Sequence, residues 1–212
     1  DAGTDRTTFT GVITSANNDI TITGTRVTLD NDNNDITGAT FNVSNGSILQ
    51  LNNETVIGNS SDLNTVNLNS SGLLYINGGT GANFYVGGLT GSGGEVRRNT
   101  GGIETIYIGN DNNNSFGGII TNLDRDGSTI TLNVNKAGSG TQTLSGNNTY
   151  IGSTTISSGT LEISGTIGWD GSSADYAQGI SNSGTLIFSG SDQTISGTIT
   201  GTGALTKSGS NE

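Results

Sequence analysis

The sequence contains no histidine, no cysteine, no proline and no methionine, and aromatic residues make up only 5% of it. Without histidine and cysteine there is no imidazole base, no thiol nucleophile and no thiolate zinc site, so the common routes to hydrolysis and to zinc binding are closed. Disulfide bonds are excluded for the same reason. The absence of proline fits a chain in which most backbone N–H groups are needed as donors between strands.

The chain is short of positive charge, with 7 Lys and Arg against 18 Asp and Glu, which gives a net charge of -11 over 212 residues. Such a surface repels phosphate backbones, so we expect no nucleic-acid partner. No apolar run approaches the roughly 20 residues of a membrane-spanning helix, and no secretory signal peptide is visible. Because the chain does not begin with methionine, we expect Asp1 to be a processed terminus or the edge of an excised fragment.

The sequence is rich in glycine, with 36 residues, and in short runs where apolar and polar residues alternate. Such alternation predicts strands with one buried face and one solvent-exposed face. Gly, Asn, Ser or Asp bound nearly all of the runs and close tight turns, and no apolar period of helical type is present. The predicted strands are Ile20–Ile22, Val27–Leu29, Phe41–Val43, Val66–Leu68, Phe84–Val86, Ile106–Ile108 and Ile130–Val134.

An internal repeat of the form Ser-Gly-x-Leu-x-apolar sets the length of the structural unit. It surrounds Leu74, Leu161 and Leu186, with a variant around Leu49. Leu49 and Leu74 are 25 residues apart, as are Leu161 and Leu186, whereas the gap between Leu74 and Leu161 is 87 residues. We therefore predict a single-stranded, right-handed β-solenoid (β-helix) with irregular coils of roughly 20 to 25 residues. The four leucines should point into one common core.

A second motif, apolar-x-Gly-x-Ile-Thr, occurs three times, at residues 9–14, 116–121 and 195–200. Short strands and frequent turns would also suit a β-sandwich. A sandwich of this length usually has some longer strands and a bulky aromatic core. The few, scattered aromatic residues instead favour the narrow core of a solenoid, lined by Ile, Leu and Val.

Residues 141–165 read TQTLSGNNTYIGSTTISSGTLEISG, and related segments occur in order along the chain: GGLTGSGG, SFGGIITN and SNSGTLIFSGSDQTISGTITGTGALTKSGS. In these features the chain resembles the strand repeat of the passenger domains of bacterial autotransporters. The resemblance is close over residues 81–212, whereas residues 1–80 share only the general pattern of short strands and turns. We treat residues 1–212 as one solenoid domain. It implies an extracellular rod at the bacterial surface that carries no catalytic group. Repeat matches of this kind inform about fold more than about function.

The chain stops within a repeat, at residues 201–212. Either the sequence is a fragment of a longer adhesin passenger, or another molecule completes the open coil. We expect the second: the N-terminal segment 1–14 of one molecule adds to segment 198–212 of the next, which builds a head-to-tail homopolymer. The expected function is thus that of a non-enzymatic subunit of a surface fibre or layer. Cell-surface glycans or a host surface are further possible partners.

Two acidic clusters contain oxygen ligands that Ca²⁺ prefers, residues 30–35 and residues 124–127. Both lack the pattern of an EF-hand and of the glycine-rich nonapeptide of β-rolls, so we expect solvated turns and no metal site. A β-helical lyase or glycosidase would need converging carboxylates, or Ca²⁺ with a basic residue. Asp30, Asp32 and Asp35, or Arg97 and Arg98, are the candidates for those roles. The two arginines should point to opposite faces of a strand, so we expect no catalytic residue and no cofactor.

Two loops complete the set of candidate sites. Residues 91–94 are rich in glycine, but no helix follows that would present its N-terminus to a phosphate, so they are predicted to form a turn. Residues 168–179 interrupt the repeat and contain the only tryptophan. Trp169 and Tyr176 could contact a neighbour or a glycan there, or fold back over the coil.

Overall fold

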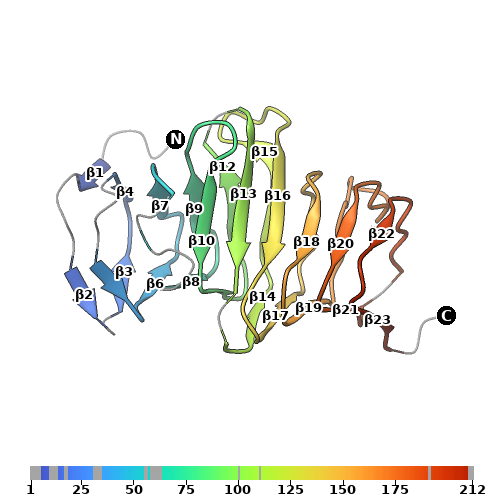
Figure 1. Ribbon diagram of the computed structural model, residues 1–212. Coiled ribbons are helices and arrows are strands. Elements are labelled where there is room, and N and C mark those ends of the chain that lie inside the picture. Colours follow the sequence, from blue (N-terminus) through green and yellow to red (C-terminus); the bar gives the residue numbers. More distant parts are fainter. Residues whose placement is uncertain are drawn as a thin grey trace.

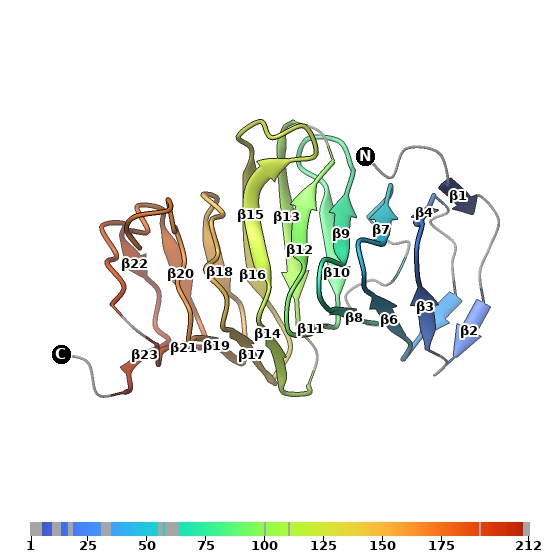
Figure 2. The same cartoon turned by 180° about the vertical axis from the view of Figure 1, so that it is seen from behind.

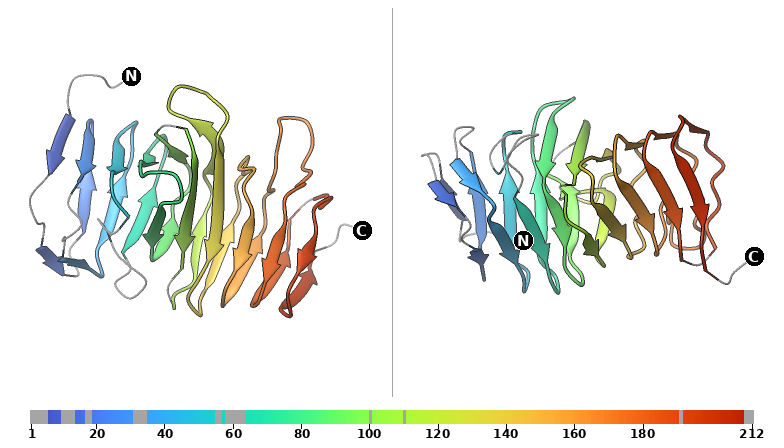
Figure 3. Two further views of the ribbon diagram at one scale, coloured as in Figure 1. Left: turned by 45° about the horizontal axis from the view of Figure 1, so that its top comes forward. Right: turned by 60° about the horizontal axis from the view of Figure 1, so that its bottom comes forward.

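The structure is a computed structural model, and it describes residues 6–9, 14–16, 19–30, 35–54, 57, 64–99, 101–109, 111–190 and 192–209. The described residues form strands, turns and connecting segments, and none of them is helical. Parallel strands wind into a β-solenoid, as the alternating pattern predicts (Figure 1). Figure 2 shows the same rod from behind, and Figure 3 shows it tilted, with its early and late strands at opposite ends.

The solenoid has three walls, and a coil passes through each of them in turn. The first wall is one parallel sheet of β1 (Arg6–Phe9), β4 (Arg26–Leu29), β7 (Ile48–Leu51), β9 (Leu73–Ile76), β12 (Glu95–Arg98) and β15 (Ile119–Asp124). The second wall begins with β2 (Thr14–Ala16) and β5 (Asp35–Thr37). It continues as β10 (Asn83–Val86), β13 (Ile103–Ile108), β16 (Thr131–Lys136), β18 (Thr154–Ile156), β20 (Ile180–Asn182) and β22 (Ile199–Thr200).

The third wall consists of two sheets. The first contains β3 (Ile20–Ile22), β6 (Thr40–Val43), β8 (Thr65–Leu68) and β11 (Gly88–Thr90). The second contains β14 (Asn114–Phe116), β17 (Thr141–Leu144), β19 (Thr160–Ile163), β21 (Thr185–Phe188) and β23 (Ala204–Lys207). A buried side chain links the two sheets: Gln142 of β17 donates from Nε2 to the carbonyl of Leu89 and accepts from the Leu89 N–H. A side chain thus satisfies backbone groups that lack a strand partner.

Strand registers give the coil lengths. The shortest offset is 19 residues, as between Thr185 and Ala204, and the longest is 28 residues, as between Ile103 and Thr131. The coils therefore vary more than the 25-residue spacing of the leucines indicates. In the longest coil an antiparallel bridge between Leu123 and Thr129 closes a hairpin turn that projects from the rod (yellow in Figure 1).

The four repeat leucines lie in one continuous core, as predicted, and each is at most 1% exposed. Leu49 pairs with Leu74 in the first wall, and Leu161 pairs with Leu186 in the third wall. The 87 residues between Leu74 and Leu161 are not a whole number of coils, because Leu74 lies in the first wall and Leu161 lies in the third. The second motif is equally scattered: residues 116–121 turn from the third wall to the first, whereas residues 195–200 lead into β22.

All seven predicted strands are present, although β16 begins one residue after Ile130. The prediction of one buried and one exposed face is wrong for three neighbouring strands of the first wall, β4, β7 and β9, whereas β12 alternates as predicted. Thr28, Gln50 and Tyr75 lie on the face opposite to Leu49 and Leu74, yet each is at most 5% exposed. Alternation along a strand fixes which side chains share a face, but only packing against other parts of the molecule decides whether that face is exposed to solvent.

Candidate functional site on the first wall

Two rows of outward side chains run across the first wall from coil to coil. The strand registers align Arg26, Ile48, Leu73 and Glu95 in one row. They align Thr28, Gln50, Tyr75 and Arg97 in the second row. Because the leucines between them point inward, both rows face away from the core. We call this surface the outer face of the first wall.

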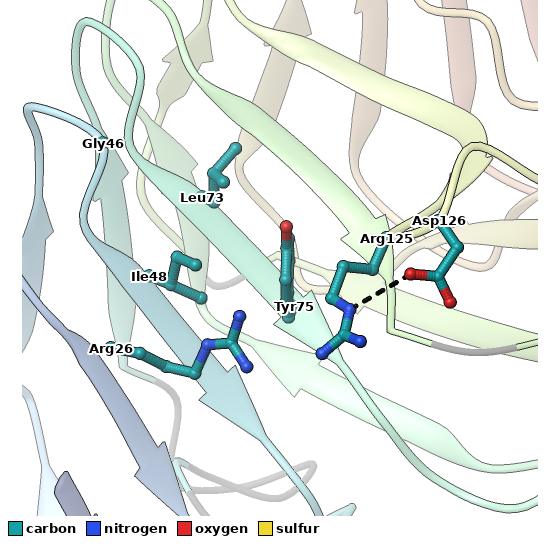
Figure 4. A pocket seen from close by; sticks show the side chains of 7 residues that line it. All are labelled: Arg26, Gly46, Ile48, Leu73, Tyr75, Arg125 and Asp126. Carbon is teal, nitrogen blue, oxygen red and sulfur yellow. Dashed lines mark hydrogen bonds and ion pairs between the residues drawn. The ribbon is translucent and has the colours of Figure 1, made fainter. Parts of the chain in front are cut away.

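A cavity of about 290 Å³ lies on this outer face (Figure 4). Ile48, Leu73 and Tyr75 supply apolar surface to it, and Arg26 supplies a guanidinium from β4. The projecting hairpin supplies Arg125 and Asp126 from the other side. Figure 4 shows the guanidinium groups of Arg26 and Arg125 directed toward the space beside Tyr75. Strands of three coils and the hairpin of a later coil thus build one site.

Two cations lie near the ring of Tyr75. The guanidinium carbon of Arg26 lies 5.7 Å from the centre of the Tyr75 ring, and that of Arg97 lies 6.0 Å from it. These distances suit cation–π attraction. Arg97 also forms an ion pair with Glu95, two residues earlier on the same face. Arg125 forms an ion pair with Asp126, with Nε 3.4 Å from Oδ1.

A second hollow of about 300 Å³ adjoins the cavity along the rod. It is lined by Leu73, Glu95 and Ile119, and by glycines and serines of the corner between the third wall and the first. Leu73 lines both hollows. The glycines include Gly93 and Gly94, which the sequence predicts to form a turn and which lie in the turn between β11 and β12.

Arg97 and Arg98 point to opposite faces, as predicted. Arg98 is 1% exposed and points into the rod, where it meets the equally buried Glu104 of β13. Nε of Arg98 lies 2.7 Å from Oε2 of Glu104, and Nη2 donates to Oε1 at 2.8 Å. Burial raises the pKa of Glu104, while the Arg98 guanidinium and the Gly78 N–H act in the opposite direction. A side chain at residue 102 would strike this guanidinium, because a Cβ there would lie 2.5 Å from Nη1.

The aspartate cluster at residues 124–127 is a turn, as predicted. Oδ1 of Asp124 accepts hydrogen bonds from the N–H groups of Asp126 and Ser128, at 3.0 and 2.8 Å. The second acidic cluster, residues 30–35, falls mostly outside the described residues, Asp32 included. Among the described residues there is no group of three or more Asp or Glu side chains placed to hold a metal ion. Nor does that part of the chain contain a helix long and apolar enough to cross a membrane.

The loop at residues 168–179 folds back over the coil at one of its two aromatic residues. Tyr176 is 1% exposed, and its hydroxyl donates to the Gly152 carbonyl and contacts Thr154 Oγ1 at 2.8 Å. Trp169 stays half-buried and bridges to Ala174. At the tip, N–H groups of Ser172 and Ser173 donate to Asp170, which lowers the pKa of Asp170 to about 2.

Lys136 is a buried cation that sequence reasoning missed. Its ammonium group donates to the carbonyls of Ala137, Gly138 and, at 3.5 Å, Ser158 of the next coil. Burial lowers the pKa of Lys136 to about 8, which the charge of Asp111 partly opposes.

Sequence reasoning also missed the cavity of Arg26, Tyr75 and Arg125, because those residues lie far apart in the sequence. The only signal was the series Arg26, Ile48, Leu73, whose spacings match the lengths of successive coils.

Comparison with known families gives one match. Residues 134–163 match the passenger-associated-transport-repeat, which agrees with the resemblance noted for residues 141–165. The match runs from β16 to β19, and the parallel β-solenoid is consistent with an autotransporter passenger. No curated protein and no solved structure matches the chain significantly.

Proposed function

We propose that the chain is part of the secreted passenger rod of a bacterial autotransporter. The starting point is the match of residues 134–163 to the passenger-associated-transport-repeat. One observation carries the proposal: the repeat stacks on itself. Val134 pairs with Thr154 in the second wall, and Thr141 pairs with Thr160 in the third wall. The matched segment is therefore one rung of the rod together with part of the next. A repeat of this kind lengthens a solenoid by stacking.

The neighbouring coil supports this proposal. Leu161 at the end of the repeat pairs with Leu186, which lies in a further copy of the Ser-Gly-x-Leu pattern. The core continues without interruption from Ile22 to Leu186. Solenoids of this construction are stabilised mainly by contacts between adjacent coils, so they serve as rigid spacers of variable length. In this role the chain acts outside the cell, as a structural or adhesive element at the bacterial surface.

The proposed role includes no catalysis. The sequence lacks histidine and cysteine, and Asp124 binds the backbone of its own turn. We expect no release of oligosaccharide from pectin or alginate, and no cleavage of peptides. Reproducible release that disappears in Asp32→Ala would contradict this part of the proposal.

The encoding reading frame provides the first test. A passenger should be preceded by a secretion signal and followed by a membrane translocator within the same polypeptide.

Display provides the second test: the chain is fused to an autotransporter translocator, and its surface exposure is measured by antibody labelling of intact cells. Wild type and Leu205→Asp should reach the surface in protease-resistant form. Leu161→Asp should be degraded, because Leu161 is buried and Leu205 is 56% exposed. Retention of the wild type inside the cell would overturn the proposal.

Self-assembly by strand addition is a second candidate function. The observation that favours it is the exposed surface of the last described strand. β23 ends the third wall in the described part of the chain, and Leu205 continues the row of Leu161 and Leu186 with no described strand beyond it. Another coil added there would bury Leu205 and extend the parallel ladder. A second copy of this chain would supply that coil with β1 and the residues around it.

Sedimentation of the purified chain separates the two candidates. Head-to-tail addition predicts filaments that persist at high salt, because few charges lie in the joint. Leu205→Asp, or deletion of residues 1–14, should then give folded monomers. A wild-type chain that stays monomeric at high concentration would eliminate self-assembly and leave the passenger rod in place.

A further inference from the structure

We propose that the cavity on the outer face of the first wall binds an acidic sugar, namely the carboxylate-bearing residue of a polysaccharide. The inference goes beyond the role of the chain as a rod and does not depend on it. It rests on three observations: the charge of the cavity, its apolar surface, and polar atoms without partners in the row of side chains that contains Tyr75.

The charge of this face differs from that of the whole chain. The protein carries 18 acidic and 7 basic residues, yet Arg26, Arg97 and Arg125 all lie on this face or border it. Two carboxylates oppose them, since Glu95 pairs with Arg97 and Asp126 pairs with Arg125. The Arg125 pair is exposed, and exposed pairs contribute little free energy. A ligand carboxylate can therefore replace Asp126 and form the two parallel hydrogen bonds that a guanidinium favours.

Three buried polar atoms in the Tyr75 row have no hydrogen-bond partner among the described residues. They are Thr28 Oγ1, Gln50 Oε1 and Arg97 Nε. Buried polar groups without partners are costly and uncommon in folded proteins, and ordered water, an ion or a ligand commonly supplies the missing partner. The three differ in kind: a hydroxyl, an amide oxygen that only accepts, and a cationic donor. Thr28, Gln50 and Arg97 do not line the cavity itself, but they share a row with Tyr75, which does. A ligand that carries hydroxyl groups and a negative charge matches the polar character of this row.

The apolar part of the cavity fits the C–H face of a sugar ring. Tyr75, Ile48 and Leu73 line it together, and aromatic and aliphatic side chains commonly form such walls around a few polar groups. A volume of about 290 Å³ lies at the lower end of the roughly 300 to 1,000 Å³ typical of ligand pockets. This corresponds to a single sugar residue. The adjoining hollow past Leu73 leaves room for the chain to continue along the rod.

Calorimetric titration of the intact chain with a short oligogalacturonate tests the proposal. Four competing probes accompany it: the methyl ester of the same oligosaccharide, a neutral oligogalactoside, inorganic phosphate and polyglutamate. We expect binding of the oligogalacturonate alone, weakened by added salt. The ¹³C-methyl NMR signals of Ile48 and Leu73 should shift on binding, and that of Leu205 at the far end of the rod should not.

The matched variants are Arg125→Ala and Lys207→Ala, because each removes one exposed positive charge. Arg125→Ala should weaken binding roughly tenfold or more, as expected for the loss of a charge-assisted hydrogen bond. Lys207→Ala should bind as the wild type does, since Lys207 lies in β23, outside the cavity. Unchanged melting temperatures show that both variants are folded.

Four results would overturn the proposal. The first is equal binding of the ester or the neutral oligosaccharide, which would show that the guanidinium groups are not used. The second is equal binding of phosphate or polyglutamate, which would remove the sugar specificity. The third is wild-type affinity in Arg125→Ala. The fourth is the absence of any binding by oligogalacturonate.

Discussion

Arg98 and Glu104 form a two-point ion pair inside the rod, with distances of 2.7 and 2.8 Å between their charged atoms and at most 1% exposure of either residue. The pair joins β12 of the first wall to β13 of the second. It stands in a core that is otherwise mostly aliphatic. Because each charge is removed from water, each depends on the other for its stabilisation.

We predict that removal of either partner of this pair is strongly destabilising. Arg98→Met or Glu104→Gln should lower the free energy of unfolding by about 3 to 5 kcal/mol, because an uncompensated polar group stays buried. The double replacement Arg98→Met with Glu104→Leu should recover much of that loss. Arg97→Ala, next along the strand on the outer face, should cost less than about 1 kcal/mol. Denaturant unfolding measures all four, and equal losses for Arg97→Ala and Arg98→Met would contradict the prediction.

A second prediction concerns the leucine row of the third wall. Leu161→Ala should lower the free energy of unfolding by about 2 to 5 kcal/mol, and Leu161→Asp should unfold the neighbouring coils because it buries an unpaired charge. Leu205 occupies the same row at its exposed end. In the monomer, Leu205→Asp should therefore change stability by less than about 0.5 kcal/mol. Thermal melts of the three variants test this, and a wild-type melt of Leu161→Asp would show that the core face is assigned wrongly.

A third prediction concerns Lys136 and pH. The pKa of Lys136 is about 8 in the folded protein, against 10.5 for an ordinary lysine. Between pH 8 and pH 10.5 the unfolded chain binds a proton that the folded protein does not. The contribution of Lys136 to the free energy of unfolding therefore rises with pH over this window, and it is lost as the pH falls to 8. The measurement is the difference in free energy of unfolding between wild type and Lys136→Met from pH 7 to pH 9.5. A difference that does not change with pH would refute the prediction.

A fourth prediction follows from the buried hydroxyl chain of Tyr150, Thr154 and Tyr176. Tyr176 gives its single proton to the Gly152 carbonyl, so Thr154 must donate to Tyr176 and Tyr150 must donate to Thr154. Tyr176→Phe leaves the Gly152 carbonyl without this donor and the Thr154 proton without an acceptor, and should cost about 1 to 3 kcal/mol. Tyr150→Phe removes only one donor to Thr154 and should cost less. Equal losses by chemical denaturation would mean that the donors run in another order.

A fifth prediction concerns metal removal. Because Asp124 Oδ1 accepts two backbone hydrogen bonds within its own turn, we expect chelation to leave the melting temperature unchanged. Calorimetry with a chelator and with added Ca²⁺ checks this. A rise in melting temperature with Ca²⁺ that Asp30→Asn abolishes would instead place a site in the cluster at residues 30–35.

The sequence by itself determined the strands and the two pairs of inward leucines. Both depend on local features: the period-two alternation within each run and the glycine-rich turns between runs. The pairs Leu49 with Leu74 and Leu161 with Leu186 follow from equal spacing, because a coil that repeats its length brings equivalent residues into register. The match to a passenger repeat also arises from this pattern.

Only the tertiary structure decided which polar residues meet. Coil lengths differ from rung to rung, so neither the partnership of Arg98 with Glu104 nor the stacking of Arg26 on Tyr75 follows from a fixed period. Arg125 reaches the same cavity because one hairpin extends beyond its coil. Alternation also cannot show that Thr28 and Gln50 are buried. These contacts join residues of different coils, and their geometry exists only once the coils have stacked.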